Sequence, residues 1–207
     1  APGAPEAVAG PAAGPARGGR GPRAPAPRGR RRAPRAATAG PRRLELGCGH
    51  GHWLCSLAEA EPEATFVGVD LVSRRIRLAE GKRARRSLEN VLFLKADADE
   101  TAEAWPSGWG LDAIHILHPD PWPKKRHAKN RLTGRERLGA YARLLEPGGR
   151  FYFRTDSLAL GEWTREELDH VPELRRLPAG TSWPSGAETY FEGLLGVGCE
   201  VIAEKRP

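Results

Sequence analysis

Apolar and polar residues alternate with two different periods along the chain after residue 42. Short runs rich in β-branched and aromatic residues predict strands, and amphipathic stretches between them predict helices. The predicted strands span residues 43–46, 65–69, 91–95, 112–117 and 150–154. The predicted helices span residues 52–60, 73–87, 133–145 and 161–170, with Ser73 as the N-cap of the second. Residues 190–204 suggest a terminal antiparallel hairpin.

This alternation of strands and helices predicts an α/β fold. Its sheet should be mostly parallel and twisted, with helices on both faces, and should end in the C-terminal antiparallel hairpin. Ligands of such sheets bind beyond the carboxyl ends of the strands, near the point where the strand order reverses. The residues that directly follow each strand are therefore the candidates for function.

Residues 1–41 differ in composition from residues 42–207, which we expect to form one folded domain. Residues 1–43 hold ten arginines, nine prolines and one acid, Glu6, a net charge of +9, whereas residues 44–207 sum to −2. A segment so poor in apolar side chains cannot offset the entropy lost on ordering, so we expect disorder in residues 1–41. Two interpretations stay open: a basic arm that holds phosphates without sequence preference, or a tail without function.

Composition excludes several classes of protein. No apolar run approaches the ~20 residues of a membrane span, and no secretory signal core is present at the start of the given sequence. Cys48, Cys55 and Cys199 form an odd set without a C-x-x-C pair, and the histidines have no ligand spacing. We therefore expect reduced thiols in a cytoplasmic protein, with neither a disulfide framework nor a metal site. The oligomeric state is open.

A glycine-rich turn follows the first strand. Gly47, Gly49 and Gly51 stand at alternate positions, which lets the backbone turn tightly and lets a ligand come close. The spacing is not the G-x-G-x-x-G that suits a pyrophosphate, which disfavours a nicotinamide oxidoreductase. Glu45 precedes the turn, and its carboxylate would repel phosphate and attract a cation. S-adenosylmethionine, which carries a sulfonium and an ammonium group, fits this charge.

Acids follow the second and third strands. Asp70 comes 23 residues after Gly47 and is placed to accept hydrogen bonds from ribose hydroxyls. Asp97 can accept from an adenine amine, whereas Asp99 and Glu100 are expected to be solvated acids. The helix after Asp70 is rich in arginine and lysine. These cations indicate either a side of the helix that faces RNA or a face exposed to solvent.

The fourth strand is followed by a proline-stiffened loop over residues 118–131, which we call the proline loop. It holds one carboxylate, Asp120, and one aromatic ring, Trp122, and it continues into a dense basic run that includes Lys124 and Arg131. A stiff acid and ring before a basic run suits a purine next to a phosphate backbone. After the fifth strand, Asp156 adds a second acid, and residues 188–192 offer further hydroxyl and carboxylate groups.

Residues 44–207 resemble the bacterial tRNA (guanine-N7-)-methyltransferases of the TrmB type. The likeness rests above all on the segment P-D-P-W-P-K-K-R-H-x-K-x-R. The turn L-E-L-G-C-G-H-G, Asp70, Asp97, the R-T-D that ends in Asp156 and the T-Y-F-E of residues 189–192 follow the family pattern in order. The resemblance implies a Rossmann-like class I methyltransferase fold, S-adenosylmethionine as methyl donor and a guanine of the tRNA variable loop as target.

The resemblance also implies roles for individual residues. Asp120 would be the catalytic acid at the reacting guanine. The cofactor would be bound by Glu45, Gly47, Gly49, Gly51, Asp70, Asp97 and Asp120. The tRNA substrate would be contacted by Lys124, Asp156, Thr189, Tyr190, Phe191 and Glu192.

Two alternatives use the same residues differently. A class I methyltransferase with a protein or small-molecule acceptor would use the same glycine turn, but the basic run of the proline loop argues against it. A non-catalytic RNA-binding protein on the same fold would not need the four acids at the strand ends, which are Glu45, Asp70, Asp97 and Asp120.

Overall fold

The structure of the chain is a computed structural model, which describes residues 40–184 and 190–207 and only the backbone of residues 190–192. The expected disorder of residues 1–41 therefore falls almost entirely outside the described residues. The strands are β1 (Arg42–Leu46), β2 (Thr65–Asp70), β3 (Val91–Lys95), β4 (Leu111–Leu117), β5 (Leu145–Thr155), β6 (Leu174–Arg176) and β7 (Cys199–Lys205). The helices are α1 (His52–Ala60), α2 (Ser73–Arg85), α3 (Ala98–Glu103), α4 (Arg135–Leu144), α5 (Leu158–Asp169), α6 (Tyr190–Leu195) and the short 3-10 helix η1 (Lys125–Asn130).

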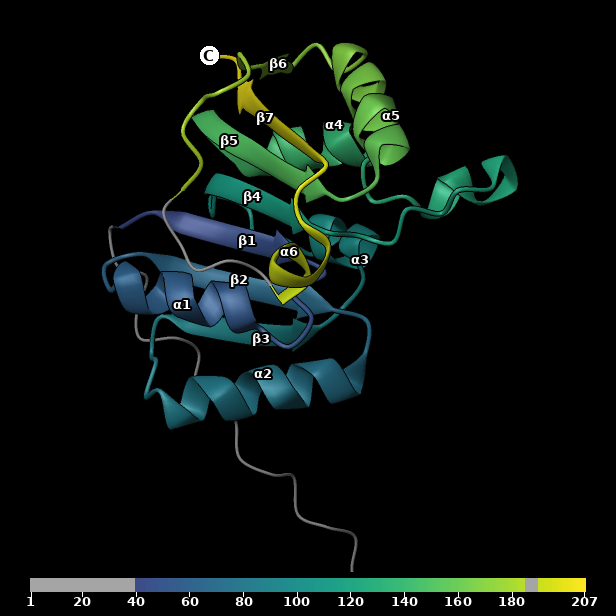
Figure 1. The fold of residues 1–207 in the computed structure, drawn as a ribbon. Coiled ribbons are helices and arrows are strands. Elements are labelled where there is room, and N and C mark those ends of the chain that lie inside the picture. Colours follow the sequence, from purple (N-terminus) through teal and green to yellow (C-terminus); the bar gives the residue numbers. More distant parts are fainter. Residues whose placement is uncertain (1–39, 185–189) are drawn as a thin grey trace, which may run out of the picture. The chain divides into compact units, whose positions relative to one another are not determined.

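The seven strands of the described residues form one sheet in the order β3-β2-β1-β4-β5-β7-β6 (Figure 1). Neighbours from β3 to β5 are parallel, and β7 is antiparallel to both β5 and β6. The predicted mostly parallel sheet with an antiparallel C-terminal part is confirmed. The strand order reverses between β1 and β4, so a crevice is expected beyond their carboxyl ends. We call the sheet edge formed by the carboxyl ends of β1 to β5 the carboxyl edge.

Helices cover both faces of the sheet, as predicted. Leu44 and Leu46 of β1 belong to an apolar cluster that includes side chains of α4 and α5. Phe66 and Phe93, from β2 and β3, belong to a second cluster that includes side chains of α1 and α2. Because successive side chains of a strand point to opposite faces, apolar residues on both faces require a helix layer on each side.

The C-terminal stretch differs from the predicted hairpin over residues 190–204. Its first part forms the helix α6, and only its second part forms a strand, β7. The partners of β7 are β5 and the short strand β6, which lie earlier in the chain. The alternation of apolar residues in β7 indicates a strand, but it does not indicate which strand lies beside it.

Candidate functional site

The glycine turn connects β1 to α1 at the carboxyl edge. Gly47, Gly49 and Gly51 have φ values of 80°, 54° and 64°, in the left-handed region that glycine adopts without strain. The Gly47 amide donates to the Val69 carbonyl at 2.9 Å, which fastens the turn to the end of β2. A Cβ on Gly51 would lie 2.6 Å from the Phe93 ring, but one on Gly47 or Gly49 would meet no described atom within 4 Å. Packing therefore requires glycine at 51, whereas the other two leave open space beside the backbone for a ligand.

Asp70 joins the glycine turn to the start of α2. The residue is 4% exposed. One of its carboxylate oxygens accepts from the Gly49 amide at 3.1 Å, and the other accepts from the Val72 amide at 2.8 Å. Arg75 forms a longer ion pair with it, at 3.4 Å. The prediction that Ser73 caps this helix is wrong: Val72 is the N-cap and makes no side-chain bond, because Asp70 binds the amide at this end.

Glu45 is a buried carboxylate beneath the glycine turn. It is 5% exposed and lies between Gly68 of β2 and His115 of β4 in the sheet register. Its Oε2 has no hydrogen-bond partner among the described residues. Burial and, to a lesser degree, the negative charge of Asp70 raise the pKa of Glu45 to about 8. A cation beside this carboxyl would stabilise its ionised form.

Lys82 of α2 supports the glycine turn from the other side. It belongs to the basic helix for which the sequence allows either an RNA-facing side or a solvated face. Neither interpretation applies to this residue. Lys82 is 9% exposed, and its Nζ donates to the carbonyl oxygen of His50 at 3.0 Å. Burial lowers the pKa of Lys82 to about 8. Lys82 is therefore part of the scaffold that shapes the turn.

Asp97 follows β3 and begins α3, a helix that the sequence analysis did not predict. Its carboxylate accepts from the Glu100 amide at 2.7 Å, and the Glu100 side chain accepts from the Asp97 amide at 3.3 Å, a capping box. Asp99 and Glu100 are exposed, as expected of solvated acids, and each also has a partner within the chain. Two hydrogen bonds of 2.7 Å from Arg137 hold Asp99 and lower its pKa. Asp97 thus lies at the carboxyl edge, with one oxygen used as a helix cap.

The proline loop leaves β4 at the carboxyl edge and ends in η1. The His118 amide donates to the Arg154 carbonyl at 2.8 Å, which ties the start of the loop to β5. His118 and Trp122 have φ values of 48° and 42°, a backbone conformation that residues other than glycine rarely adopt. Asp120, between them, is exposed, and so is Lys124. Strained backbone on both sides of an exposed acid is typical of functional sites and persists only where the surroundings hold it.

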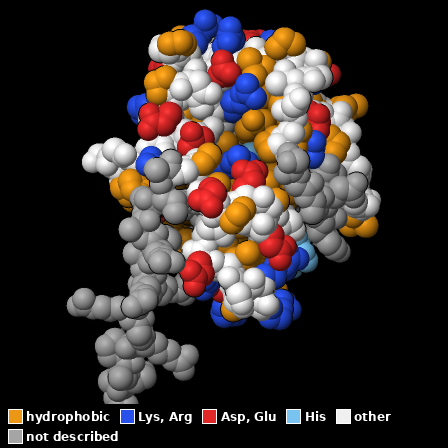
Figure 2. All heavy atoms as spheres, turned by 90° about the vertical axis from the view of Figure 1, so that its left-hand side faces the viewer, with side chains coloured by type: hydrophobic (Ala, Val, Ile, Leu, Met, Phe, Trp, Pro, Cys, Tyr) orange, Lys and Arg blue, Asp and Glu red, His pale blue; other side chains and the backbone are white. Residues whose placement is uncertain are grey.

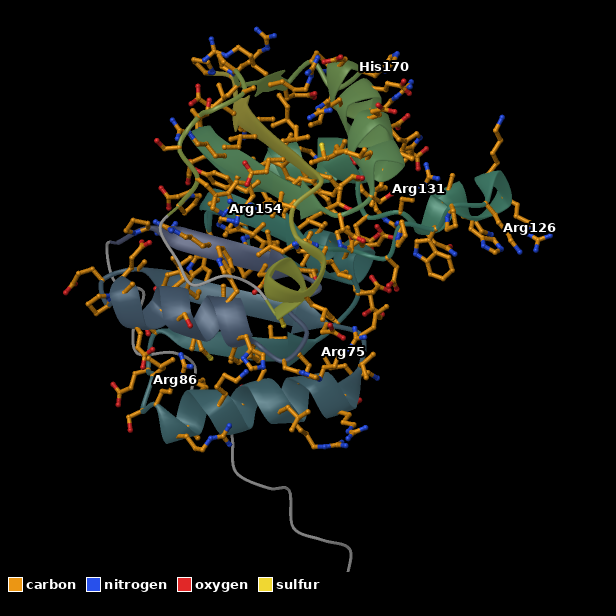
Figure 3. All side chains as sticks on the ribbon, in the orientation of Figure 1. Arg75, Arg86, Arg126, Arg131, Arg154 and His170 are labelled. Carbon is orange, nitrogen blue, oxygen red and sulfur yellow. The ribbon has the colours of Figure 1, made fainter. Side chains whose placement is uncertain are left out.

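Arg131 holds the proline loop. Its guanidinium donates to the carbonyl oxygens of Pro121 at 3.2 Å and Trp122 at 3.0 Å. The same group lies over the Trp163 ring of α5, 4.6 Å from the ring centroid. Figure 3 shows Arg131 at the base of the projecting loop and Arg126 near its tip. In the sequence, Arg131 is only one cation of the basic run. Its spacing does not show whether its side chain holds the loop or is exposed to solvent.

Arg137 of α4 holds the other end of the loop. Its Nη1 donates to the carbonyl oxygens of Lys129 at 3.0 Å and Arg131 at 2.8 Å. The rest of its guanidinium binds Asp99, so one side chain links α3, α4 and the end of η1. Sequence reasoning missed this residue, since an arginine in the first turn of an amphipathic helix has no local signal of such a role.

Asp156 lies at the same edge, beyond β5. Its side chain is 42% exposed, and its Oδ1 lies 3.8 Å from Nδ1 of His118 at the start of the proline loop. The structure therefore brings the predicted acids after β4 and β5 to one rim. Thr189 lies outside the described residues, and Tyr190, Phe191 and Glu192 are described only as backbone of α6. Their predicted substrate contacts stay predictions.

Comparison with known proteins decides the family. Residues 39–192 match a family model described as a putative methyltransferase. A tRNA (guanine-N(7)-)-methyltransferase of Chloroflexus aggregans is 37% identical over 151 residues, which cover 73% of this chain and 67% of the relative. The chain belongs to the tRNA (guanine-N7-)-methyltransferase family. The resemblance drawn from the glycine turn and the proline loop is thereby confirmed.

Other members of this methyltransferase family match a similar stretch. Relatives with the same name from Macrococcus caseolyticus and Acinetobacter baylyi are 35% and 34% identical over 131 and 145 residues. These matches cover 63% and 70% of this chain, and 61% and 59% of the relatives. The chain thus spans roughly two thirds or less of the length of the curated relatives it matches.

Solved structures of other methyltransferases share the fold. A SAM-dependent O-methyltransferase from Thermotoga maritima aligns with a TM-score of 0.54 at 18% identity, covering 83% of this chain and 61% of that one. A putative rRNA-methylase from Clostridium thermocellum aligns with a TM-score of 0.55 at 15% identity, covering 81% and 87%. The predicted class I methyltransferase fold is confirmed.

The described residues include neither a membrane-spanning helix nor a cluster of metal ligands. No helix in residues 40–184 and 190–207 is long and apolar enough to cross a bilayer. The same residues hold no group of three or more His, Cys, Asp or Glu side chains that could bind a metal ion.

Proposed function

We propose that this methyltransferase-family chain transfers a methyl group from S-adenosylmethionine to N7 of a guanine in the variable loop of tRNA. The proline loop carries the proposal. Its sequence carries most of the resemblance to the family, and its exposed Asp120 follows the carboxyl end of β4, the strand next to β1 and its glycine turn. This arrangement allows one ligand at the turn and a second, planar ligand at the loop.

The residues at the glycine turn fit the cofactor. Oε2 of Glu45 is buried without a partner among the described residues, which suits a ligand with a positive charge. The positions next to Gly47 and Gly49 are open, which suits a close approach to the backbone. Asp70 and Asp97 would accept hydrogen bonds from the ribose hydroxyls and the adenine amine. When bound, S-adenosylmethionine supplies an electrophilic methyl group on a sulfonium.

Asp120 has the task of binding a purine that becomes positively charged. N7 of guanine has an in-plane lone pair and no proton, so its methylation needs no general base. A carboxylate can accept hydrogen bonds from guanine N1–H and N2–H, which selects the base and directs N7 away from the loop. The same negative charge stabilises the ring as positive charge develops on it.

The basic run of the proline loop would hold the phosphates on either side of the target base. A base within a stacked RNA cannot reach a pocket at the edge of the sheet, so the guanine must leave its stack. Lys124 follows Asp120 closely and is exposed. Lys124 and Asp156 both follow strands that end at the carboxyl edge, where a displaced nucleotide would bind.

Replacement of Lys124 by alanine is expected to weaken tRNA binding several-fold and to lower the salt dependence of binding by about one ion. Affinity for S-adenosylmethionine should not change, because Lys124 lies away from the glycine turn. Fluorescence anisotropy of a labelled tRNA at several salt concentrations measures both quantities. Arg143→Ala removes another exposed cation, at the end of α4, and serves as the matched control. Equal binding by the two variants would remove Lys124 from the interface.

The raised pKa of Glu45 predicts a pH-dependent affinity for S-adenosylmethionine. Below a pH of about 8 the free protein holds this carboxyl mostly protonated. Binding of a cation beside it must then release a proton, so affinity should rise with pH up to about 8, at most ~10-fold per unit, and then level off. Calorimetry in buffers of different ionisation enthalpy measures both the affinity and the released proton. Glu45→Gln should bind more weakly with a flat profile, and an equally flat wild-type profile would contradict this role.

The activity itself is tested by methyl transfer from labelled S-adenosylmethionine to unmodified tRNA transcripts, with the product base identified. We expect 7-methylguanine in the variable loop and no label when that guanine is replaced by adenine. Label on another base or on protein would overturn the proposed acceptor. Cofactor binding without any transfer would favour a non-catalytic RNA-binding protein.

A further inference from the structure

The helix α2 presents a row of arginines on the side away from the sheet. Its buried residues are Ile76, Ala79 and Lys82, which face β2, β3 and the glycine turn. Arg74, Arg77 and Arg85 lie on the opposite side, within about 80° of one another around the helix axis at 3.6 residues per turn. All three are exposed, and we call them the arginine stripe.

The arginine stripe is not neutralised within the described part of the chain. The other basic residues of this region have partners: Arg75 pairs with Asp70, Arg83 with Glu80, and Arg86 with Glu59. No hydrogen bond or ion pair joins any stripe guanidinium to residues 40–184 or 190–207. The first turn of α2 also lacks an acid, although acids are favoured there by the helix dipole. The stripe therefore carries about three uncompensated positive charges.

The face of the molecule at the amino ends of the strands is different. Figure 2 shows that acidic and basic side chains are interspersed on that face. The row of arginines on α2 thus contrasts with the mixed charges of that face.

A glycine lies in the middle of the stripe. Gly81 falls between Arg77 and Arg85 on the same side of α2, where glycine lowers helix stability relative to other residues. Its conformation is helical, and a Cβ added to it would meet only the flexible tip of Arg85, at 3.4 Å. Neither the backbone nor the packing of this chain requires glycine there. A glycine in such a place leaves room for another chain to approach closely.

We propose that the arginine stripe, with Gly81 at its centre, is a second RNA-binding surface that contacts the phosphate backbone of the substrate. α2 begins three residues after Asp70, so its stripe starts at the carboxyl edge and runs away from it. From Arg74 to Arg85 the helix rises about 16 Å, over which a nucleic-acid strand presents several phosphates. Leu78 is the one exposed large apolar side chain of α2 itself, so the outer side of this helix lacks the apolar centre of a protein interface. The proposal rests on the proposed function, because it takes tRNA as the polyanion.

The sharpest test changes Gly81 and leaves every arginine in place. Gly81→Glu puts a carboxylate four residues from both Arg77 and Arg85, where it forms ion pairs with them and repels phosphate. Gly81→Gln has nearly the same shape without the charge. Both replacements favour the helix over glycine, so loss of folding does not confuse the result.

We expect the Gly81→Glu variant to bind unmodified tRNA roughly tenfold more weakly near physiological salt. Its slope of log Kd against log salt should be smaller than the wild-type slope by about 1 to 2. Gly81→Gln should stay within about twofold of the wild type, and neither change should alter affinity for S-adenosylmethionine. Equal tRNA affinities for the glutamate and glutamine variants would overturn the proposal.

A triple variant tests the arginines themselves. Arg74→Ala, Arg77→Ala and Arg85→Ala together should weaken tRNA binding at least as much as Gly81→Glu does. The control removes three exposed arginines elsewhere, Arg143, Arg175 and Arg206, for the same change of net charge. Equal weakening of tRNA binding in both triple variants would mean that net charge alone determines the affinity, which overturns the stripe as a binding surface.

These measurements give binding constants, so they remain distinct from a failure of methyl transfer by the wild-type protein. Unchanged tRNA binding by the stripe variant would overturn the proposal. If that variant instead lost binding to an acidic protein, the stripe would be assigned to that protein.

Discussion

Replacement of Asp120 by asparagine should lower the turnover of tRNA methylation by roughly 10²- to 10³-fold while affinity for S-adenosylmethionine changes little. The amide keeps the size of the side chain, but it removes the negative charge and directs N–H groups toward the N–H donors of guanine. Asp120 is exposed on a loop between two residues with positive φ, so the replacement should leave the fold intact. Single-turnover kinetics at saturating cofactor and tRNA measure the effect.

The matched control for this prediction is Asp156→Asn. Asp156 is a second acid at the same rim, with its side chain 42% exposed. It should affect tRNA binding more than turnover, because it lies beyond β5 and not on the proline loop. If Asp120→Asn lowers cofactor affinity as much as turnover, its assigned role at the guanine is wrong.

Replacement of Arg131 by lysine should lower turnover roughly 10- to 100-fold, although Arg131 need not touch substrate. Lysine keeps the charge but lacks the planar fork, so it cannot donate to the Pro121 and Trp122 carbonyls and still lie flat over Trp163. The strained backbone at Trp122 would then relax and move Asp120 away from the target base. Rates and KM for tRNA, measured together, should show a fall in kcat with little change in KM.

Two comparisons separate this positioning role from a general loss of stability. Arg126→Lys changes an exposed arginine near the tip of the same loop and should retain nearly full turnover. In the double variant with Asp120→Asn, Arg131→Lys should add little, because both changes act through the same carboxylate. Additive losses would mean that Arg131 acts independently of Asp120.

Much of the fold follows from local pattern. The predicted helix over residues 52–60 and the strand over 91–95 coincide with α1 and β3. In both cases the periodicity, the composition and the flanking turn residues indicate the same element. The prediction is wrong over residues 190–195, where the partner of β7 is distant in the chain and the hairpin pattern does not specify it. The pattern does not indicate the helix α3, because this helix is short and its cap, Asp97, stands where an acid could also bind a ligand.

The basic residues show the limit of sequence reasoning at the site. The sequence does not distinguish Lys82, Arg131 and Arg77 from one another, since each is a cation in a basic stretch. The structure makes the first a buried support of the glycine turn and the second a clamp on the proline loop. It leaves the third exposed on α2. Hydrogen bonds between distant segments determine these differences, and no local spacing encodes them.

Five parallel strands, the glycine turn and the acids near the strand ends follow from the sequence, because backbone preference and side-chain chemistry are properties of short segments. The raised pKa of Glu45, the strain of the proline loop and the difference between paired and unpaired arginines of α2 emerge from the tertiary structure. These depend on burial and on partners brought together from distant parts of the chain, since both the pKa of a carboxyl and the availability of a guanidinium are set by what surrounds them.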